Sequence, residues 1–155
     1  MQEKPNIVFV MTDDQGPWAF GAAGDLNART PNLDQLCKQG CRLTNYFGMS
    51  AVCSPSRACL ITSRYSTEVG IPDFIPNKES NIGLDKSFPT WPSLLTDAGY
   101  ETALIGKWHL GSSDEHHPTC HGYQEFKGFR IGAGTSVSYT HLRAHETRHD
   151  LVCRL

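Results

Sequence analysis

The sequence has few of the features that mark several common protein classes. None of its six cysteines forms a Cys-x-x-Cys pair, which argues against a zinc ribbon or a thioredoxin-like site, and six are too few for a disulfide scaffold. No apolar run reaches the roughly 18–20 residues that a membrane helix needs. Fourteen basic residues oppose sixteen acidic ones, and the net charge of -2 offers no electrostatic footprint for nucleic acid. We therefore expect no nucleic-acid partner and no membrane span.

The N-terminus shows no secretory signal peptide. Residues 1–5 lead directly into an apolar segment, with no basic region, long hydrophobic region or small-residue cleavage site. The protein is either cytoplasmic, or periplasmic or secreted with its leader missing, and the residues do not separate these compartments.

What is present is an ordinary globular composition, 39% hydrophobic and 19% charged, with alternating strand and helix signals. Three segments are predicted to be β-strands: 6–11, 42–47 and 101–106. The first of them is a continuous apolar run, typical of a strand that is buried on both faces of a parallel sheet.

Three further segments are predicted to be helices: 30–37, 54–63 and 92–98. Thr30 suits the N-cap of the first helix, Pro31 its first turn and Gly40 its end. Pro55 falls in the first turn of the second helix, and Gly99 closes the third. This alternation of strands and helices favours an α/β fold with a mostly parallel sheet.

Four polar residues follow the predicted strands at their carboxyl ends: Asp13, Asp14, Lys107 and His109. Active sites of open parallel sheets lie beyond the carboxyl ends of the strands. We therefore expect the topology to gather these residues at one edge of the sheet.

Residues 53–57, Cys-Ser-Pro-Ser-Arg, carry the clearest chemical signal. Most free cysteines are small buried hydrophobes, but Cys53 stands at the start of a predicted helix, where the backbone N–H groups favour an anion. Arg57 lies one helical turn further on, so its guanidinium can turn back toward Cys53. The residues alone leave open a buried cysteine and a thiolate nucleophile of lowered pKa.

The same five residues resemble the Cys-x-Pro-x-Arg signature of the type I, formylglycine-dependent sulfatases of the alkaline-phosphatase-like superfamily. Further segments resemble that family in the same order: the opening strand and metal loop at 5–14, the first helix at 30–36, the second signature at 99–111 and the segment at 121–129. The resemblance covers about residues 4 to 136. It implies an α/β/α sandwich, incomplete in this chain, that hydrolyses sulfate esters.

The resemblance also implies a cofactor made from the chain itself. Cys53 would be oxidised to formylglycine by a formylglycine-generating enzyme or an anaerobic sulfatase-maturing enzyme. The aldehyde hydrates to a geminal diol, of which one hydroxyl can attack sulfur while the other later expels sulfate. Arg57 would hold the modified residue, Lys107 would contact the sulfate, and His109 would assist deprotonation of a diol hydroxyl.

Asp13 and Asp14 are adjacent carboxylates after the first predicted strand. Such pairs are commonly solvated turns, but the resemblance implies that both ligate a divalent cation together with the modified Cys53. Hard oxygen ligands suit Ca²⁺, with Mg²⁺ as the alternative ion. The ion would lower the pKa of the diol and stabilise charge on the sulfuryl oxygens.

The character of the chain changes at about residue 137. Three histidines recur every fourth residue, at positions 141, 145 and 149, which taken directly would predict a zinc-binding helix. Residues 137–155 instead resemble the translation of a synthetic sequencing-library adapter, so we exclude them as a non-native tail. Residues 1–136 are then expected to be the N-terminal part of a sulfatase catalytic domain.

The later metal and sulfate ligands of the family have no counterpart in the sequence, so we expect this chain as written to be inactive and poorly folded alone. Two other functions stay open: a phosphonate or phosphodiester hydrolase of the same superfamily, and a non-catalytic binding protein that keeps the fold. The substrate is expected to be a sulfated small molecule or glycan. Residues 114–117, Asp-Glu-His-His, are expected to form a surface loop rather than a metal site.

Overall fold

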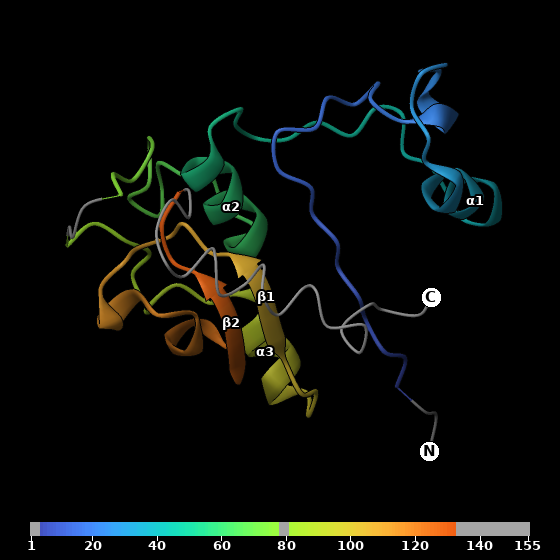
Figure 1. Ribbon diagram of the computed structural model, residues 1–155. Helices are drawn as coiled ribbons and strands as arrows, with labels where there is room; N and C mark the ends of the chain where they lie inside the picture. Colours follow the sequence, from blue (N-terminus) through green and yellow to red (C-terminus); the bar gives the residue numbers. More distant parts are fainter. Residues whose placement is uncertain (1–3, 78–80, 133–155) are drawn as a thin grey trace. The chain divides into compact units, whose positions relative to one another are not determined.

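The computed structural model describes residues 4–77 and 81–132, and the chain divides into two units, Met1–Phe47 and Gly48–Leu155 (Figure 1). Each unit is described by itself. The tail that we predict at 137–155 lies outside the described residues. Within the described part, no helix is long and apolar enough to cross a membrane.

The first unit contains a short 3₁₀ helix, η1 (Gly21–Ala23), and one α-helix, α1 (Pro31–Gln39). The predicted limits of the helix are confirmed: Thr30 is the N-cap, and Gly40 is the C-cap, whose N–H donates to the Leu36 carbonyl at 2.8 Å. None of the residues of α1 is buried. Local hydrogen bonds, rather than a core, therefore hold this helix.

Side chains of α1 and its N-cap hold η1. The Thr30 hydroxyl accepts from the Gly21 N–H at 2.8 Å instead of capping its own helix. The Asp34 carboxylate accepts from the Ala22 N–H at 2.7 Å. These two bonds satisfy N–H groups at the start of η1 that have no partner within so short a helix.

The predicted strands at 6–11 and 42–47 are wrong for this structure, because neither segment is a strand. The apolar side chains of residues 7–11 are 40% to 83% exposed. A β-strand is held by hydrogen bonds to a neighbouring strand. Among the described residues there is one strand pair, and both of its strands lie in the second unit. An apolar run without a ladder partner has nothing to fix it as a strand.

The second unit holds the remaining elements in this order: α2 (Cys53–Thr62), α3 (Trp91–Asp97), β1 (Ala103–Lys107), η2 (Asp114–His116), η3 (Pro118–His121) and β2 (Glu125–Phe129). The predictions of α2, α3 and β1 are confirmed, and β2 was not predicted. β1 and β2 pair in parallel, with Ala103 opposite Glu125 and Lys107 opposite Phe129. The parallel pair and the helices agree with the α/β class.

β1 and β2 approach closely at a pair of glycines. Gly106 lies opposite Gly128 in the register, and Gly106 has a φ of 118°. A Cβ added at Gly128 would overlap the backbone carbonyl of Gly106. Only a residue without a side chain fits here, so the glycine at position 128 is a requirement of the strand pairing.

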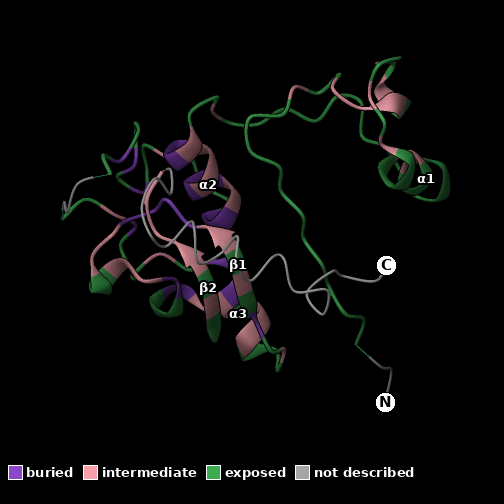
Figure 2. Cartoon of the chain, in the orientation of Figure 1, coloured by how far each residue is buried: buried purple, intermediate pink, exposed green. Residues whose placement is uncertain are grey.

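The core of the second unit is built from α2, from the segment between α2 and α3, and from the segments after β1. Its buried apolar members are Ala58, Ile61, Val69, Ile71, Ile75, Leu84, Trp108, Leu110 and Tyr123. Figure 2 shows this concentration of buried residues around α2, in contrast to the exposed surface of α1. The core therefore fixes both the first turns of α2 and the residues that follow β1.

Candidate functional site

Cys53 is the first residue of α2, as the sequence predicts, and it is half-buried. Val52 is the N-cap with extended backbone (φ -95°, ψ 138°), and its carbonyl accepts from the Ser56 N–H at 2.9 Å. Ser54 and Pro55, which follow Cys53, are buried. The helix thus presents its cysteine at the N-terminal turn, where the peptide dipoles favour negative charge.

Arg57 joins α2 to the end of β1. Its Nη1 donates to the backbone carbonyl of Lys107 at 2.7 Å, in a partly buried position. Two of the predicted site residues, 50 positions apart in sequence, are therefore brought together. A guanidinium offers five donors in a planar fork, so a single arginine can hold this carbonyl and a second group at once.

His109 lies two residues beyond β1 and is only 1% exposed. Its backbone is left-handed, with a φ of 57°, which a non-glycine residue adopts only where its surroundings hold it there. Its Nε2 lies 2.9 Å from the carbonyl oxygen of Ile75, and its ring meets that of Phe74 edge-on at 4.8 Å. A Cβ at Gly132 would come within 2.6 Å of His109 Cε1, so the ring is enclosed on this side too.

Ser54 and Ile75 are residues of the site that the sequence reasoning missed. The buried Ser54 Oγ accepts from the Ile75 N–H at 3.2 Å. Ile75 lies in a loop between two predicted helices, and neither periodicity nor a motif marks its backbone as a hydrogen-bonding group. In the sequence, the only hint of this contact is the serine that follows Cys53 in the Cys-Ser-Pro-Ser-Arg segment.

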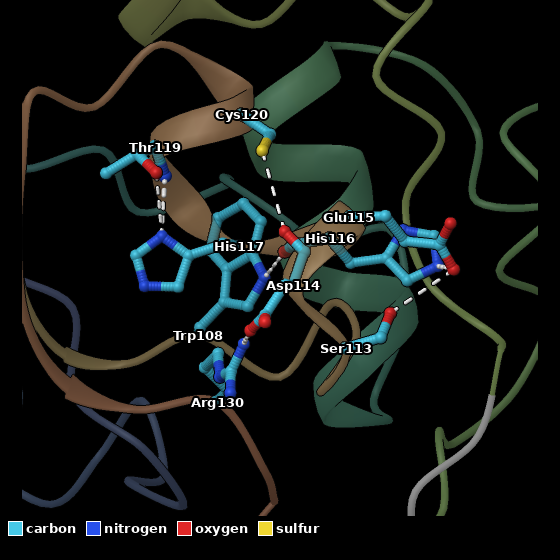
Figure 3. Close-up of polar contacts among 9 residues, drawn as sticks. All are labelled: Trp108, Ser113, Asp114, Glu115, His116, His117, Thr119, Cys120 and Arg130. Carbon is cyan, nitrogen blue, oxygen red and sulfur yellow. Dashed lines mark hydrogen bonds and ion pairs between the residues drawn. The ribbon is translucent and has the colours of Figure 1, made fainter.

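Trp108 packs in the core, with 3% exposure. Figure 3 shows its Nε1 donating to the backbone carbonyl of His116, at 2.9 Å. The Nδ1 of His116 lies 2.9 Å from the Leu84 carbonyl, so this histidine is an anchor rather than part of a loose surface loop. Asp114 remains at the surface, where it pairs with Arg130 at 2.8 Å.

Burial governs the ionisation of two side chains beside Trp108. The His121 ring lies 5.4 Å from the Trp108 ring, and burial lowers the pKa of His121 to about 4, an effect that His116 increases and Asp85 opposes. Burial raises the pKa of Tyr123 to about 12, against the effect of Arg57. Both groups are therefore neutral at pH 7.

Asp13 and Asp14 lie in the first unit, and both are exposed. Asp14 has a positive φ of 62°. Lys107 and His109 belong to the second unit, so the gathering of Asp13, Asp14, Lys107 and His109 at one sheet edge stays a prediction. Two carboxylates have the right chemistry for part of a calcium site, which takes six to eight oxygens. Among residues 4–77 and 81–132, no group of three or more His, Cys, Asp or Glu is placed to hold a metal ion.

These observations define an α/β protein with a cysteine at a helix N-terminus, an arginine that ties this helix to a parallel strand, and an enclosed histidine beyond that strand. The Sulfatase family model matches residues 5–143, so the match continues past residue 136. The chain belongs to the sulfatase family.

Two kinds of comparison describe this similarity. Steryl-sulfatase of Homo sapiens is 40% identical over 139 residues, which cover 83% of this chain and 24% of that protein. The crystal structure of Ps i-CgsB superimposes with a TM-score of 0.81 at 33% identity, covering 92% of this chain and 33% of that one. A further solved structure, in complex with its substrate D-Glucosamine-2-N, 6-O-disulfate, has a TM-score of 0.67 at 36% identity, covering 80% and 23%. The chain spans about a quarter of the length of its curated relatives.

Proposed function

We propose that this chain is the N-terminal part of an enzyme that hydrolyses sulfate esters through a formylglycine made from Cys53, with the aid of a divalent cation. The observation that carries the proposal is the position of Cys53 at the first residue of α2, with Arg57 one turn further on and bound to the Lys107 carbonyl. In a member of the sulfatase family, this is the place where the modified residue is expected.

The side chains around Cys53 would divide the work. When formylglycine is present, its hydrated aldehyde supplies the nucleophile. Arg57 would orient the modified residue, because its guanidinium is already anchored on one side by Lys107. The ammonium of Lys107 would bind a sulfate oxygen, and the enclosed imidazole of His109 would take up the proton that the nucleophile releases.

Asp13 and Asp14 would hold the cation, Ca²⁺ or Mg²⁺, with oxygen from the modified Cys53 as a further ligand. The ion, when bound, stabilises negative charge on the sulfuryl oxygens. Asp13, Asp14 and the modified Cys53 would supply only part of the oxygen ligands. The later ligands of the family have no counterpart in this sequence, so we expect the 155-residue chain to be inactive. Sulfatase activity of the purified chain would contradict that expectation.

The substrate that we propose is a sulfated sugar or a small sulfated alcohol. One structural neighbour binds a disulfated glucosamine, whereas a curated relative is a steryl-sulfatase. The second partner would be the maturing enzyme that converts Cys53.

Mass spectrometry of the chain co-expressed with a maturing enzyme tests the first step. Trypsin releases the peptide from Leu43 to Arg57, in which we expect the Cys53 thiol to be replaced by an aldehyde. Cys59, which lies on the same helix in the next tryptic peptide, and the exposed Cys120 are internal controls that should stay thiols. A plain Cys53 thiol under these conditions would overturn the formylglycine route.

Paired aryl esters then separate the reaction classes. In a protein that carries this sequence at full family length, we expect kcat/KM for an aryl sulfate to exceed that for the matching aryl phosphate by at least about tenfold, about 1.4 kcal/mol in transition-state free energy. The reverse preference would favour a phosphonate or phosphodiester hydrolase. Activity that survives as a plain thiol but is lost on alkylation would indicate a thiolate nucleophile instead.

A further inference from the structure

We propose that Ser54 is a positioning residue for His109, acting through the backbone of Ile75, and that this chain of hydrogen bonds fixes the imidazole with its proton on Nε2. The effect on catalysis rests on the proposed function, but the hydrogen-bond chain does not.

The first link joins the signature helix to the loop that follows it. Ser54 is fully buried next to Cys53, and its Oγ accepts the Ile75 N–H at 3.2 Å. The side chain of Ile75 is 3% exposed and belongs to the core. The backbone of Ile75 is therefore held on one side by a hydrogen bond and on the other by packing.

The second link determines the protonation of the ring. The Ile75 carbonyl can only accept a hydrogen bond, and it lies 2.9 Å from His109 Nε2. Nε2 must then be the donor, in both the neutral and the charged ring. In the neutral ring the lone pair is left on Nδ1, which becomes the basic nitrogen of His109.

Two further contacts restrict the ring to this orientation. Phe74, next to Ile75, packs edge-on against it at 4.8 Å. Gly132 leaves no room for a side chain between its own backbone and the ring, and its N–H donates to the Asn77 carboxamide oxygen at 2.7 Å. The loop that Ser54 holds therefore also encloses His109. A shift of Ile75 would move both the hydrogen-bond acceptor of the ring and the side chains that pack against the ring.

The decisive experiment is nitrogen-15 NMR of His109 together with amide hydrogen exchange of Ile75, in a protein that carries this sequence at full family length, with and without Ser54→Ala. We expect the Nε2–H tautomer in the wild type, a mixture of tautomers in S54A, and at least about tenfold faster exchange of the Ile75 amide, which is a change of about 1.4 kcal/mol. A wild-type ring protonated on Nδ1, or an S54A chain with both signals unchanged, would overturn the inference.

Two matched variants separate positioning from general damage. Thr62→Val removes another buried hydroxyl of α2, whose bond goes to the Ala58 carbonyl of the same helix, and should leave both signals as in the wild type. Ser54→Thr keeps the hydroxyl and should restore the tautomer. If S54T fails to fold, the comparison of S54A with T62V still decides.

Kinetics in the protein of full family length give an independent readout, normalised to the fraction of Cys53 that is converted. S54A should lower kcat about 10- to 100-fold with little change in KM, because a misplaced proton acceptor affects the transition state more than binding. A rise in KM by the same factor as the fall in kcat would contradict a positioning role. If no variant, wild type included, hydrolyses sulfate esters, the proposed function fails while the NMR result still stands.

Discussion

The two units of this chain form helices in different circumstances. In the first unit, α1 has no buried residue, and Leu26 is 98% exposed. In the second unit, α2 buries six of its ten residues, and Leu84 is fully buried. A helix closes its hydrogen bonds within its own segment, so Thr30 and Gly40 define α1 even where no core supports it.

Strands show the opposite behaviour in the same comparison. Residues 6–11 and residues 101–106 both predict a strand from their apolar side chains, but only the second segment gives one, because β2 supplies its ladder. A strand needs a partner that is distant in sequence, whereas a helix does not. If this contrast is correct, mutations in the second unit should affect stability strongly and matching ones in the first unit weakly.

The largest effect should come from Gly128→Ala, which places a methyl group on the carbonyl oxygen of Gly106 and forces β1 and β2 apart. We expect a loss of about 4 kcal/mol or more in the free energy of unfolding, measured by urea denaturation. Gly48→Ala, at the first residue of the second unit and outside its core, is the control. Its Cβ would lie in ordinary contact, 3.7 Å from the Ser50 carbonyl oxygen, and the substitution should change stability by less than about 0.5 kcal/mol. Equal effects at the two glycines would mean that the strand pair contributes little.

Leucine truncation compares the units directly. Leu84→Ala creates a cavity in the core and should cost about 3 kcal/mol, whereas Leu26→Ala should change stability by less than about 0.5 kcal/mol. Urea unfolding followed by the fluorescence of Trp91 and Trp108, in a Trp18→Phe background, reports the second unit alone. A large effect of L26A on this fluorescence signal would contradict the expected difference in stability between the two units.

Acid should lower the free energy of unfolding of the second unit, because His121 is buried there. The first unit contains no histidine, so it should lack this effect. The unfolded ring takes up a proton near pH 6.5 but the buried ring only at about pH 4, so the free energy of unfolding should fall as pH drops between these values, by about 3 kcal/mol. His121→Phe should remove this part of the pH dependence. An unchanged pH dependence of the unfolding free energy in H121F would contradict the assignment to His121.

The smallest effect is expected for one arginine from each unit, the half-buried Arg130 and the exposed Arg42. Arg130 pairs with Asp114 at 2.8 Å, and Arg42 donates to the Ala22 carbonyl at 2.7 Å. Each alanine substitution should cost about 0.5 kcal/mol, because solvent screens both contacts. A double-mutant cycle of Arg130 with Asp114 should give a coupling that shrinks in high salt; a coupling above about 2 kcal/mol would show that this loop is more buried in solution.

The sequence allowed prediction of those parts that depend on short-range rules. Pro31, Pro55 and Gly99 mark their helices correctly, and the apolar run of β1 is sufficient to identify it. β2 was missed because Glu125 and Lys127 alternate with Phe126 and a glycine, which gives a weak strand pattern whose support comes from β1.

For the site, too, motifs could be recognised in the sequence but contacts between distant segments could not. Motif resemblance singled out Cys53, Arg57, Lys107 and His109, and the structure gives Arg57 and Lys107 a shared hydrogen bond. The support of His109 by Ile75 could not be read from the residues, because a backbone carbonyl carries no sequence signal. The roles of Asp13 and Asp14 stay predictions.

The hydrogen bonds around His109 and Arg57 span long stretches of chain: 21 residues from Ser54 to Ile75, 34 from Ile75 to His109 and 50 from Arg57 to Lys107. Each one closes a loop, and the entropic cost of closure must be met before the bond contributes. We therefore expect these bonds to form later in folding than the local hydrogen bonds of α2. Until these bonds form, the segment around Cys53 would be open to other molecules, and this interval would set the time available to the maturing enzyme that we propose.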